Sequence, residues 1–287
     1  MKPLSILVVS GTYAPDIGGS EGSIRTACRE LSRRGHCVRV VADDRRPARG
    51  VIDGVPVFGV SPDGVPQLLS HLHADVRCDV VLTQLIYSRE ALRWARCCGV
   101  PSIYFVRNSE MRLDLSTDGA DTPSRLVANS QFIAARTFER WRRKAAVVYP
   151  LIDFRDVVPE SRTGEVVTCI NPIRIKGGDM FRALARRHTD RRFLCVFGWT
   201  GLKRREGDQG WDPRQWSLMA HAHDDPTVHP PDSPTFDECT NVTAIPSTPD
   251  MRSVYARTRV LLFPSRWDEA FGRSILEALG CGIPVIA

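Results

Sequence analysis

Two glutamates separated by seven residues, Glu269 and Glu277, stand near the end of the 287-residue chain. An apolar run precedes them and apolar residues at helical spacing follow, which predicts a strand, a loop and then a helix. At about 1.5 Å per residue, this geometry places the two carboxylates along one wall of a site. The amides of Phe271, Gly272 and Arg273 stand at the predicted helix start, where N–H groups without intrahelical partners bind phosphate.

A second candidate site contains Lys176, directly before Gly177 and Gly178. It follows a strand pattern and precedes a helix pattern, so it lies at the carboxyl end of a strand, where open α/β sheets bind ligands. A cation beside exposed glycine amides suits a diphosphate. Taken alone, Lys176 also fits a solvated turn lysine, and Glu277 also fits an exposed helical glutamate.

A third candidate is the glycine pair Gly18 and Gly19, in the turn-rich stretch after the first apolar run. Paired glycines let backbone amides approach an anion or a sugar, and the positive end of the following helix points there. Many α/β turns contain two glycines, so the pair alone is a weak indicator. The stretch is not G-x-G-x-x-G, which disfavours a Rossmann oxidoreductase.

The elements that position these residues alternate between strands and helices. Apolar runs rich in branched residues predict strands at 4–9, 37–41, 51–60 (a hairpin), 79–83, 101–106, 146–149, 165–170, 192–197, 241–245, 260–263 and 283–287. Apolar residues three and four apart predict helices at 24–31, 89–98, 130–144, 179–187, 249–257 and 271–279. Strand–helix–strand units at this spacing predict an α/β fold with parallel sheets.

Polar segments predict how the chain divides. The segment 151–164 reads as an interdomain linker between Rossmann-like domains at 1–150 and 165–287. The segment 198–239 lacks periodicity and predicts a long surface insertion. We expect no metal in this insertion, because solvated loop histidines are the more frequent explanation for His221, His223 and His229.

Composition limits the function classes. With 43% hydrophobic residues, 25% charged residues and a net charge of +6, the chain is typical of soluble globular proteins and not of collagen, disordered or integral membrane proteins. Its basic residues are scattered and no RNA-recognition or zinc-finger pattern accompanies them, so we expect no nucleic-acid partner. The positive charge still suits phosphorylated substrates or peripheral contact with an anionic membrane.

Nine cysteines, an odd number without C-x-x-C spacing, predict reduced thiols in a cytoplasmic protein. The apolar runs are too short for a signal peptide or a spanning helix, so we expect at most peripheral membrane association.

The context of the two glutamates is Pro-Ser-x3-Glu-Ala-Phe-Gly-Arg-x3-Glu-Ala, which resembles the donor-site signature of family 4 glycosyltransferases with the GT-B fold. Other stretches resemble the same family in the same order. They are Tyr13-Ala-Pro-x2-Gly-Gly-x-Glu21, Val127-Ala-Asn-Ser130, Val148-Tyr-Pro-x-Ile-Asp153, Lys176-Gly177 and Asn241-Val-x3-Pro246. The matches span residues 4 to 287, and the segment with the two glutamates is the most specific.

The resemblance implies two Rossmann-like domains whose parallel sheets face a cleft. It implies transfer of a sugar from a nucleotide-diphosphate sugar, with retention of configuration and without a metal or cofactor. Lys176 would hold the diphosphate, Glu277 the ribose hydroxyls, and Glu269 the transferred sugar. The remaining donor-binding residues by resemblance are Gly18, Gly19, Arg174, Phe271, Gly272 and Arg273. The acceptor, a glycan, a lipid-linked sugar or a small molecule, is left open.

The sequence also departs from the family. The Gly-Arg pair that precedes the family's lysine is replaced near Asn171, where Arg174 is the available substitute. Arg107 and Asn108 stand where the family often has a histidine. The last predicted strand has no further elements after it, so the second domain is predicted to be incomplete. A catalytically inactive remnant that binds a nucleotide sugar or a partner is therefore the alternative function.

Overall fold

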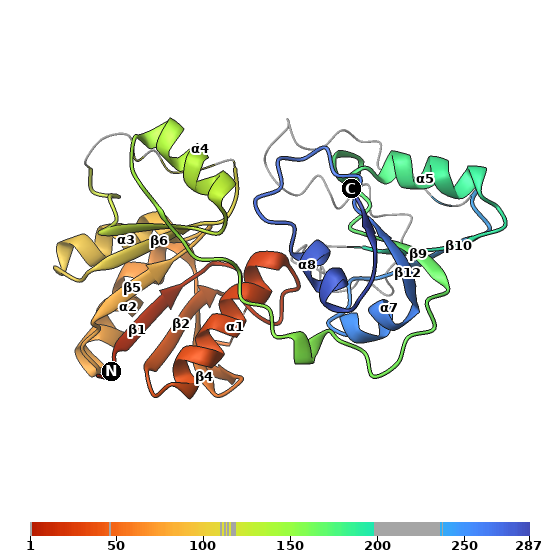
Figure 1. The fold of residues 1–287 in the computed structure, drawn as a ribbon. Coiled ribbons are helices and arrows are strands. Elements are labelled where there is room, and N and C mark those ends of the chain that lie inside the picture. Colours follow the sequence, from red (N-terminus) through yellow and green to blue (C-terminus); the bar gives the residue numbers. More distant parts are fainter. Residues whose placement is uncertain are drawn as a thin grey trace. The chain divides into compact units, whose positions relative to one another are not determined.

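The computed structural model describes residues 2–287 except 46, 110, 112, 114, 116–118, 198–235 and 237. Contacts divide the chain into an N-terminal unit, Met1–Pro15 with Gly19–Leu151, and a C-terminal unit, Asp16–Gly18 with Ile152–Ala287. Each unit is an α/β layer structure around a largely parallel sheet, which confirms the predicted fold class (Figure 1).

The N-terminal sheet has the strand order β3-β4-β2-β1-β5-β6-β7-β8 among the described residues. Its strands are β1 (Ser5–Val9), β2 (Cys37–Asp43), β3 (Gly50–Ile52), β4 (Val55–Val60), β5 (Val80–Thr83), β6 (Ser102–Val106), β7 (Arg125–Ala128) and β8 (Ala146–Val147). All neighbouring strands are parallel except β3 and β4, the predicted hairpin. Its turn, Asp53-Gly54, has positive φ at both residues, as a two-residue hairpin turn requires.

Helices cover both faces of the N-terminal sheet. They are α1 (Gly19–Arg33), α2 (Val65–Asp75), α3 (Ser88–Cys97) and α4 (Gln131–Trp141). Along β1, Leu7 and Val9 pack with α2 and α3, whereas the alternate residues Ile6 and Val8 pack with α1. This two-sided burial explains why β1 is a continuous apolar run in the sequence.

The C-terminal sheet is parallel throughout its described strands, in the order β11-β10-β9-β12-β13. The strands are β9 (Val166–Ile170), β10 (Arg192–Val196), β11 (Val242–Ile245), β12 (Thr258–Leu262) and β13 (Val285–Ile286). The helices are α5 (Gly178–Arg187), α7 (Met251–Arg257) and α8 (Arg273–Gly280). Phe181 of α5 packs with one core cluster, whereas Tyr255 of α7 and Ala278 of α8 share another.

Most predicted elements agree with the structure to within two residues, and four differences are larger. The helix predicted from residue 24 begins at Gly19, five residues earlier. No element was predicted between residues 61 and 78, where α2 lies, nor for β7. The helix predicted to reach residue 144 ends at Trp141, because Arg142 adopts a left-handed conformation. The predicted insertion lies mostly outside the described residues, but its end is not on the surface, since Phe236 and Cys239 pack into the C-terminal core.

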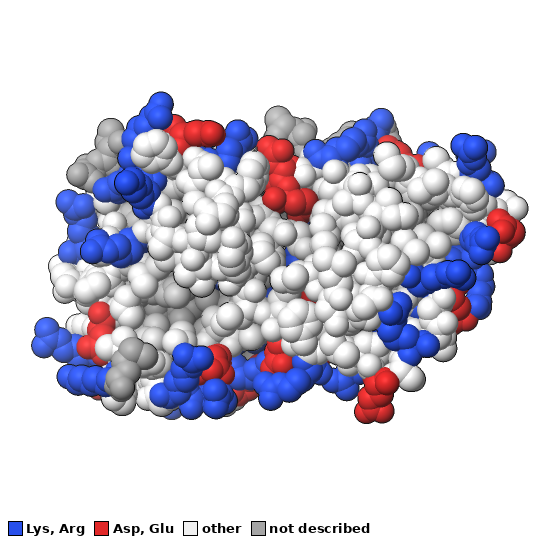
Figure 2. All heavy atoms as spheres, viewed as in Figure 1, with Lys and Arg blue, Asp and Glu red and all other residues white. Residues whose placement is uncertain are grey.

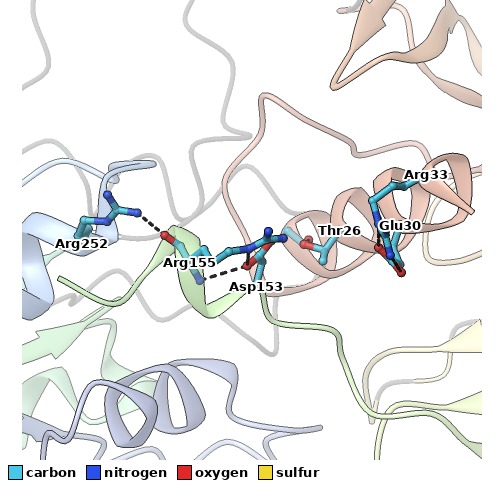
Figure 3. A network of polar contacts seen from close by, with 7 residues as sticks. Thr26, Glu30, Arg33, Asp153, Arg155 and Arg252 are labelled. Atoms are coloured by element: carbon cyan, nitrogen blue, oxygen red, sulfur yellow. Dashed lines mark hydrogen bonds and ion pairs between the residues drawn. The ribbon is translucent and has the colours of Figure 1, made fainter. Parts of the chain in front are cut away.

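The segment that begins the C-terminal unit is anchored to that unit. The Asp153 carboxylate accepts hydrogen bonds from the Arg155 guanidinium at 2.7 and 2.9 Å, and Arg252 of α7 donates to the Arg155 carbonyl (Figure 3). Arg162 donates to the carbonyls of Thr258 and Gly282. Of the residues predicted to form a linker, 152–164 thus belong to this unit.

On the face shown in Figure 2, Lys and Arg side chains lie mostly around the margins of the two units, with acidic side chains among them. Among the described helices, none is long and apolar enough to cross a bilayer. All nine cysteines are free thiols.

Candidate functional site

Two loops meet at the carboxyl edge of the C-terminal sheet. One follows β9 and contains Lys176, and the other follows β12 and contains Glu269; these two strands are neighbours in the sheet. The loops are joined directly, because the Arg266 amide donates to the Ile175 carbonyl and its guanidinium donates to the Arg174 carbonyl, both at 2.9 Å. Parallel β9 and β12 therefore bring together two segments that are about ninety residues apart.

Gly177 makes this close approach possible. Its φ is +81°, and a Cβ there would lie 2.1 Å from the Pro264 carbonyl oxygen. Both the conformation and the contact exclude a side chain. The glycine after Lys176 is thus explained by the packing of the two loops.

Lys176 and Glu269 form an ion pair, with 2.8 Å between Nζ and Oε1. The Ser265 hydroxyl donates to the same oxygen at 3.0 Å and accepts from the Trp267 amide at 3.3 Å. The two charged side chains are 21% and 22% exposed, so water still reaches the pair. A cation and a carboxylate, both accessible, can exchange partners when an anionic ligand arrives.

Glu277 is in a different environment, buried on α8 at 7% exposure. Its Oε1 accepts from Arg273 Nε at 2.5 Å, and its Oε2 accepts from the Tyr255 hydroxyl at 2.8 Å. Burial, and then the Glu277 carboxylate, raises the pKa of Tyr255, so this hydroxyl stays protonated and donates. The exposed helical glutamate considered as an alternative is therefore wrong.

Tyr255 was not identified from the sequence, where it lies among the apolar positions of a short helix. The available signal is its chemistry, because a buried tyrosine hydroxyl needs a hydrogen-bond partner. Nothing in the linear pattern shows that this partner is Glu277, 22 residues further along the chain.

The start of α8 differs from its prediction by two residues. Gly272 caps the helix with φ +70°, and the first helical residue is Arg273. Phe271 and Gly272 therefore precede the helix, and the first-turn amides begin with Arg273. The predicted phosphate contacts of these three amides stay a prediction.

The remaining donor-site candidates lie at two places. Arg174 forms a short turn with Lys176 and pairs with Asp179 at 3.2 Å on the surface. Asn171, near the place of the family's Gly-Arg pair, has φ +57°, a conformation that asparagine tolerates better than most residues. Gly18 and Gly19 lie where β1 leads into α1, and their approach to a donor stays a prediction.

The carboxyl edge of the N-terminal sheet carries a buried network of polar side chains. Arg107, which replaces the expected histidine, donates to Gln84 Oε1 at 2.7 Å and stacks 3.5 Å above the Phe105 ring. Gln84 in turn donates to the Ser10 hydroxyl. Asn129 donates to the Arg107 carbonyl. These hydrogen bonds connect the ends of four adjacent strands, β1, β5, β6 and β7.

No group of three or more His, Cys, Asp or Glu side chains is arranged to hold a metal ion within the described part of the chain. The three insertion histidines lie outside that part.

Two family models match the sequence. Residues 18–156 match the model described as Glycosyl transferase 4-like domain, and residues 239–287 match the model described as Glycosyl transferases group 1. No curated protein sequence matches the chain.

Solved structures share the fold at low sequence identity. Sucrose-phosphate synthase from Thermosynechococcus elongatus is 15% identical, with a TM-score of 0.70 over 99% of this chain and 81% of that one. Anabaena Alr3699/HepE, solved in complex with UDP and glucose, is 15% identical, with a TM-score of 0.67 over 99% and 80%. A glycosyltransferase from Rickettsia africae is 15% identical, with a TM-score of 0.65 over 100% and 79%.

Proposed function

We propose that this chain, which belongs to the GT-B glycosyltransferases, transfers a sugar from a nucleotide-diphosphate sugar to an acceptor. The transfer retains the configuration of the sugar and needs no metal. Lys176 contacts the diphosphate, Glu269 the transferred sugar and Glu277 the ribose of the nucleotide. Arg174 and the residues around the start of α8 complete the donor site.

One observation carries this proposal. At the carboxyl edge of a parallel sheet, Lys176 on the loop after β9 pairs at 2.8 Å with Glu269, which lies on the loop from β12 to the helix bearing Glu277. The edge is where open α/β sheets bind ligands. The lysine is complementary in charge to a diphosphate, and the two carboxylates are acceptors for the hydroxyls of a ribose and a sugar. The similar Anabaena structure holds UDP and glucose, which agrees with a uridine nucleotide as the first donor to test.

The chemistry follows from the accessible ion pair. Departure of a nucleoside diphosphate leaves negative charge on the leaving oxygen, and a cation fixed beside it lowers the barrier. Lys176 supplies that charge once the diphosphate replaces Glu269 as its partner. Glu269 is then free to accept hydrogen bonds from hydroxyls of the transferred sugar.

The acceptor is the least defined part of the proposal. A basic chain with a pI near 9.0 favours an acceptor that carries phosphate or stands on an anionic lipid surface. We place the activity in the cytoplasm, with the membrane as a peripheral surface. A glycan or a small molecule remains the alternative acceptor.

Binding and transfer are tested separately. Calorimetry with UDP, GDP and ADP measures binding, and release of nucleotide from the matching sugar donors measures turnover. Lys176→Ala and Glu277→Ala should each weaken binding by about 10-fold or more, because a hydrogen bond to a charged group contributes about 1.5–3 kcal/mol. Lys144→Ala and Glu139→Ala, at exposed positions, are the matched controls. Unchanged affinity in both site variants contradicts the site, and binding without turnover favours the inactive nucleotide-sugar-binding protein.

A further inference from the structure

Tyr255 has no role in the proposed reaction, yet it is bound to one of its residues. The side chain is fully buried, in a cluster with Val157, Leu261 and Ala278. Its hydroxyl donates to Glu277 Oε2 at 2.8 Å. The tyrosine comes from α7 and the glutamate from α8, so this hydrogen bond joins two helices.

The two oxygens of Glu277 are held from different directions. Arg273 Nε, one turn earlier on α8, binds Oε1 at 2.5 Å, and Tyr255 binds Oε2. A carboxylate accepts about four hydrogen bonds, so each oxygen keeps capacity for another donor. Two acceptors fixed in one plane fit two neighbouring hydroxyl groups, such as the vicinal diol of a ribose.

We propose that Tyr255 is a positioning residue that fixes the Glu277 carboxylate for the ribose diol of the nucleotide. The inference rests on the proposed function, in which Glu277 binds that ribose. Arg273 alone holds one oxygen, and the carboxylate plane can then turn about its terminal bond. The tyrosine hydroxyl removes that freedom before the ligand binds, so less entropy is lost on binding.

A purely structural role makes a different prediction. A buried hydroxyl that only satisfies a buried carboxylate contributes to stability, and its loss weakens all ligands equally or none. A positioning role instead changes the discrimination between nucleotides that have and lack the diol. The ratio of the two affinities therefore separates the two roles.

The experiment compares a nucleoside diphosphate with its 2′,3′-dideoxy analogue by calorimetry, using whichever of UDP, GDP and ADP the wild type binds most tightly. We expect the wild type to prefer the ribose form by about 10-fold or more. Tyr255→Phe should reduce that preference by about 5-fold, with the dideoxy affinity unchanged. Tyr104→Phe, at another buried tyrosine in the N-terminal unit, should leave the preference intact.

A second measurement keeps the Tyr255 hydroxyl, in case Tyr255→Phe does not fold. The chain has five tyrosines, so fluorotyrosine labelling gives five fluorine resonances. Single Tyr→Phe variants at the other four tyrosines assign theirs, and the remaining resonance belongs to Tyr255. The ribose nucleotide should shift the Tyr255 resonance, and the dideoxy analogue should not. Equal shifts with both ligands, or none, contradict the positioning role.

The outcomes separate this inference from the proposed function. If the wild type binds no nucleoside diphosphate, both fall together. If the wild type prefers the ribose form and Tyr255→Phe keeps that preference, only the positioning role of Tyr255 is contradicted. In a Glu277→Ala background, adding Tyr255→Phe should change the preference no further, because the hydrogen bond through which Tyr255 acts is already absent.

Discussion

The two glutamates of the Glu-x7-Glu segment have the same chemistry and opposite surroundings. Glu269 lies in a loop, partly exposed, with Lys176 and Ser265 as its partners. Glu277 lies on a helix, buried, with one donor on each oxygen. An ion pair that water reaches is weak and exchangeable, whereas breaking a buried pair leaves a charge without compensation. On the proposed function, we therefore expect Glu269 to change partners during turnover and Glu277 to keep its own.

The largest effect is expected where the loop of Glu269 meets that of Lys176. Gly177→Ala forces a side chain into a left-handed backbone and against the Pro264 carbonyl. The conformation costs about 1–2 kcal/mol and the contact about 1–3 kcal/mol more. The free energy of unfolding should fall by their sum, and nucleotide binding should be lost, as measured by urea denaturation and calorimetry.

Gly164→Ala is the matched control, because Gly164 has φ +59° and nothing lies within 4 Å of its added Cβ. Its free energy of unfolding should fall only by the cost of the left-handed conformation, about 1–2 kcal/mol, and nucleotide binding should be kept. Equal losses in the two glycine variants would mean that the contact with Pro264 does not matter.

The comparison of the two glutamates is tested by replacing each with glutamine. Glu277→Gln leaves Arg273 without its carboxylate, and the unfolding free energy should fall by about 2–3 kcal/mol, since the pair is largely but not fully buried. Glu269→Gln should change it by less than about 1 kcal/mol while lowering turnover about 10-fold or more. Urea denaturation and turnover of the two variants give both numbers. A larger loss of unfolding free energy in Glu269→Gln than in Glu277→Gln would contradict the difference between an exchangeable and a buried pair.

Local sequence patterns predict where the two glutamates lie along the chain and which elements carry them. Continuous apolar runs identified the parallel strands other than β7, and the parallel order placed Lys176 and Glu269 at one edge. The helix α2 was missed because Gly64 and Pro66, read locally, indicate a turn, although proline is well tolerated in the first turn of a helix.

Burial and partners across the fold are not in the local pattern. Glu277 and Tyr255 are neighbours only because α7 and α8 pack in one cluster, and an acidic residue at a helical position is exposed by default. Likewise, a lysine before two glycines does not reveal that Gly177 stands against a neighbouring loop. Such information comes from tertiary contacts, which single-sequence patterns do not encode.

A smaller effect should come from the serine that holds Glu269. Ser265→Ala removes one of the two donors on Oε1 and leaves Lys176 in place. The loss of one hydrogen bond at a partly exposed site should lower kcat/KM about 3–10-fold, with a stability change of about 0.5–1 kcal/mol. Steady-state kinetics and thermal unfolding measure both, and Ser161→Ala, at an exposed position, is the control. An unchanged kcat/KM would show that Glu269 needs no help from Ser265.

The smallest effect is expected for Glu30, a carboxylate whose ion pairs with arginine lie on the helix surface. Glu30 on α1 accepts hydrogen bonds from Arg33 and Arg34 at the helix surface (Figure 3 shows Arg33). These donors lower the pKa of Glu30 to about 2. Because the folded pKa lies below the unfolded value of about 4.3, the stabilisation is present above that value and is lost as the pH falls toward 2.

Glu30→Gln should therefore lower the unfolding midpoint slightly at pH 7. Near pH 2 the wild type has lost most of this stabilisation, so the midpoints of the two proteins should become nearly equal. Added salt at pH 7 should shrink the same difference, because exposed ion pairs are screened. Glu277→Gln should keep most of its destabilisation in salt, since its pair is buried. If salt affected both variants equally, exposure would not be what separates the two kinds of pair.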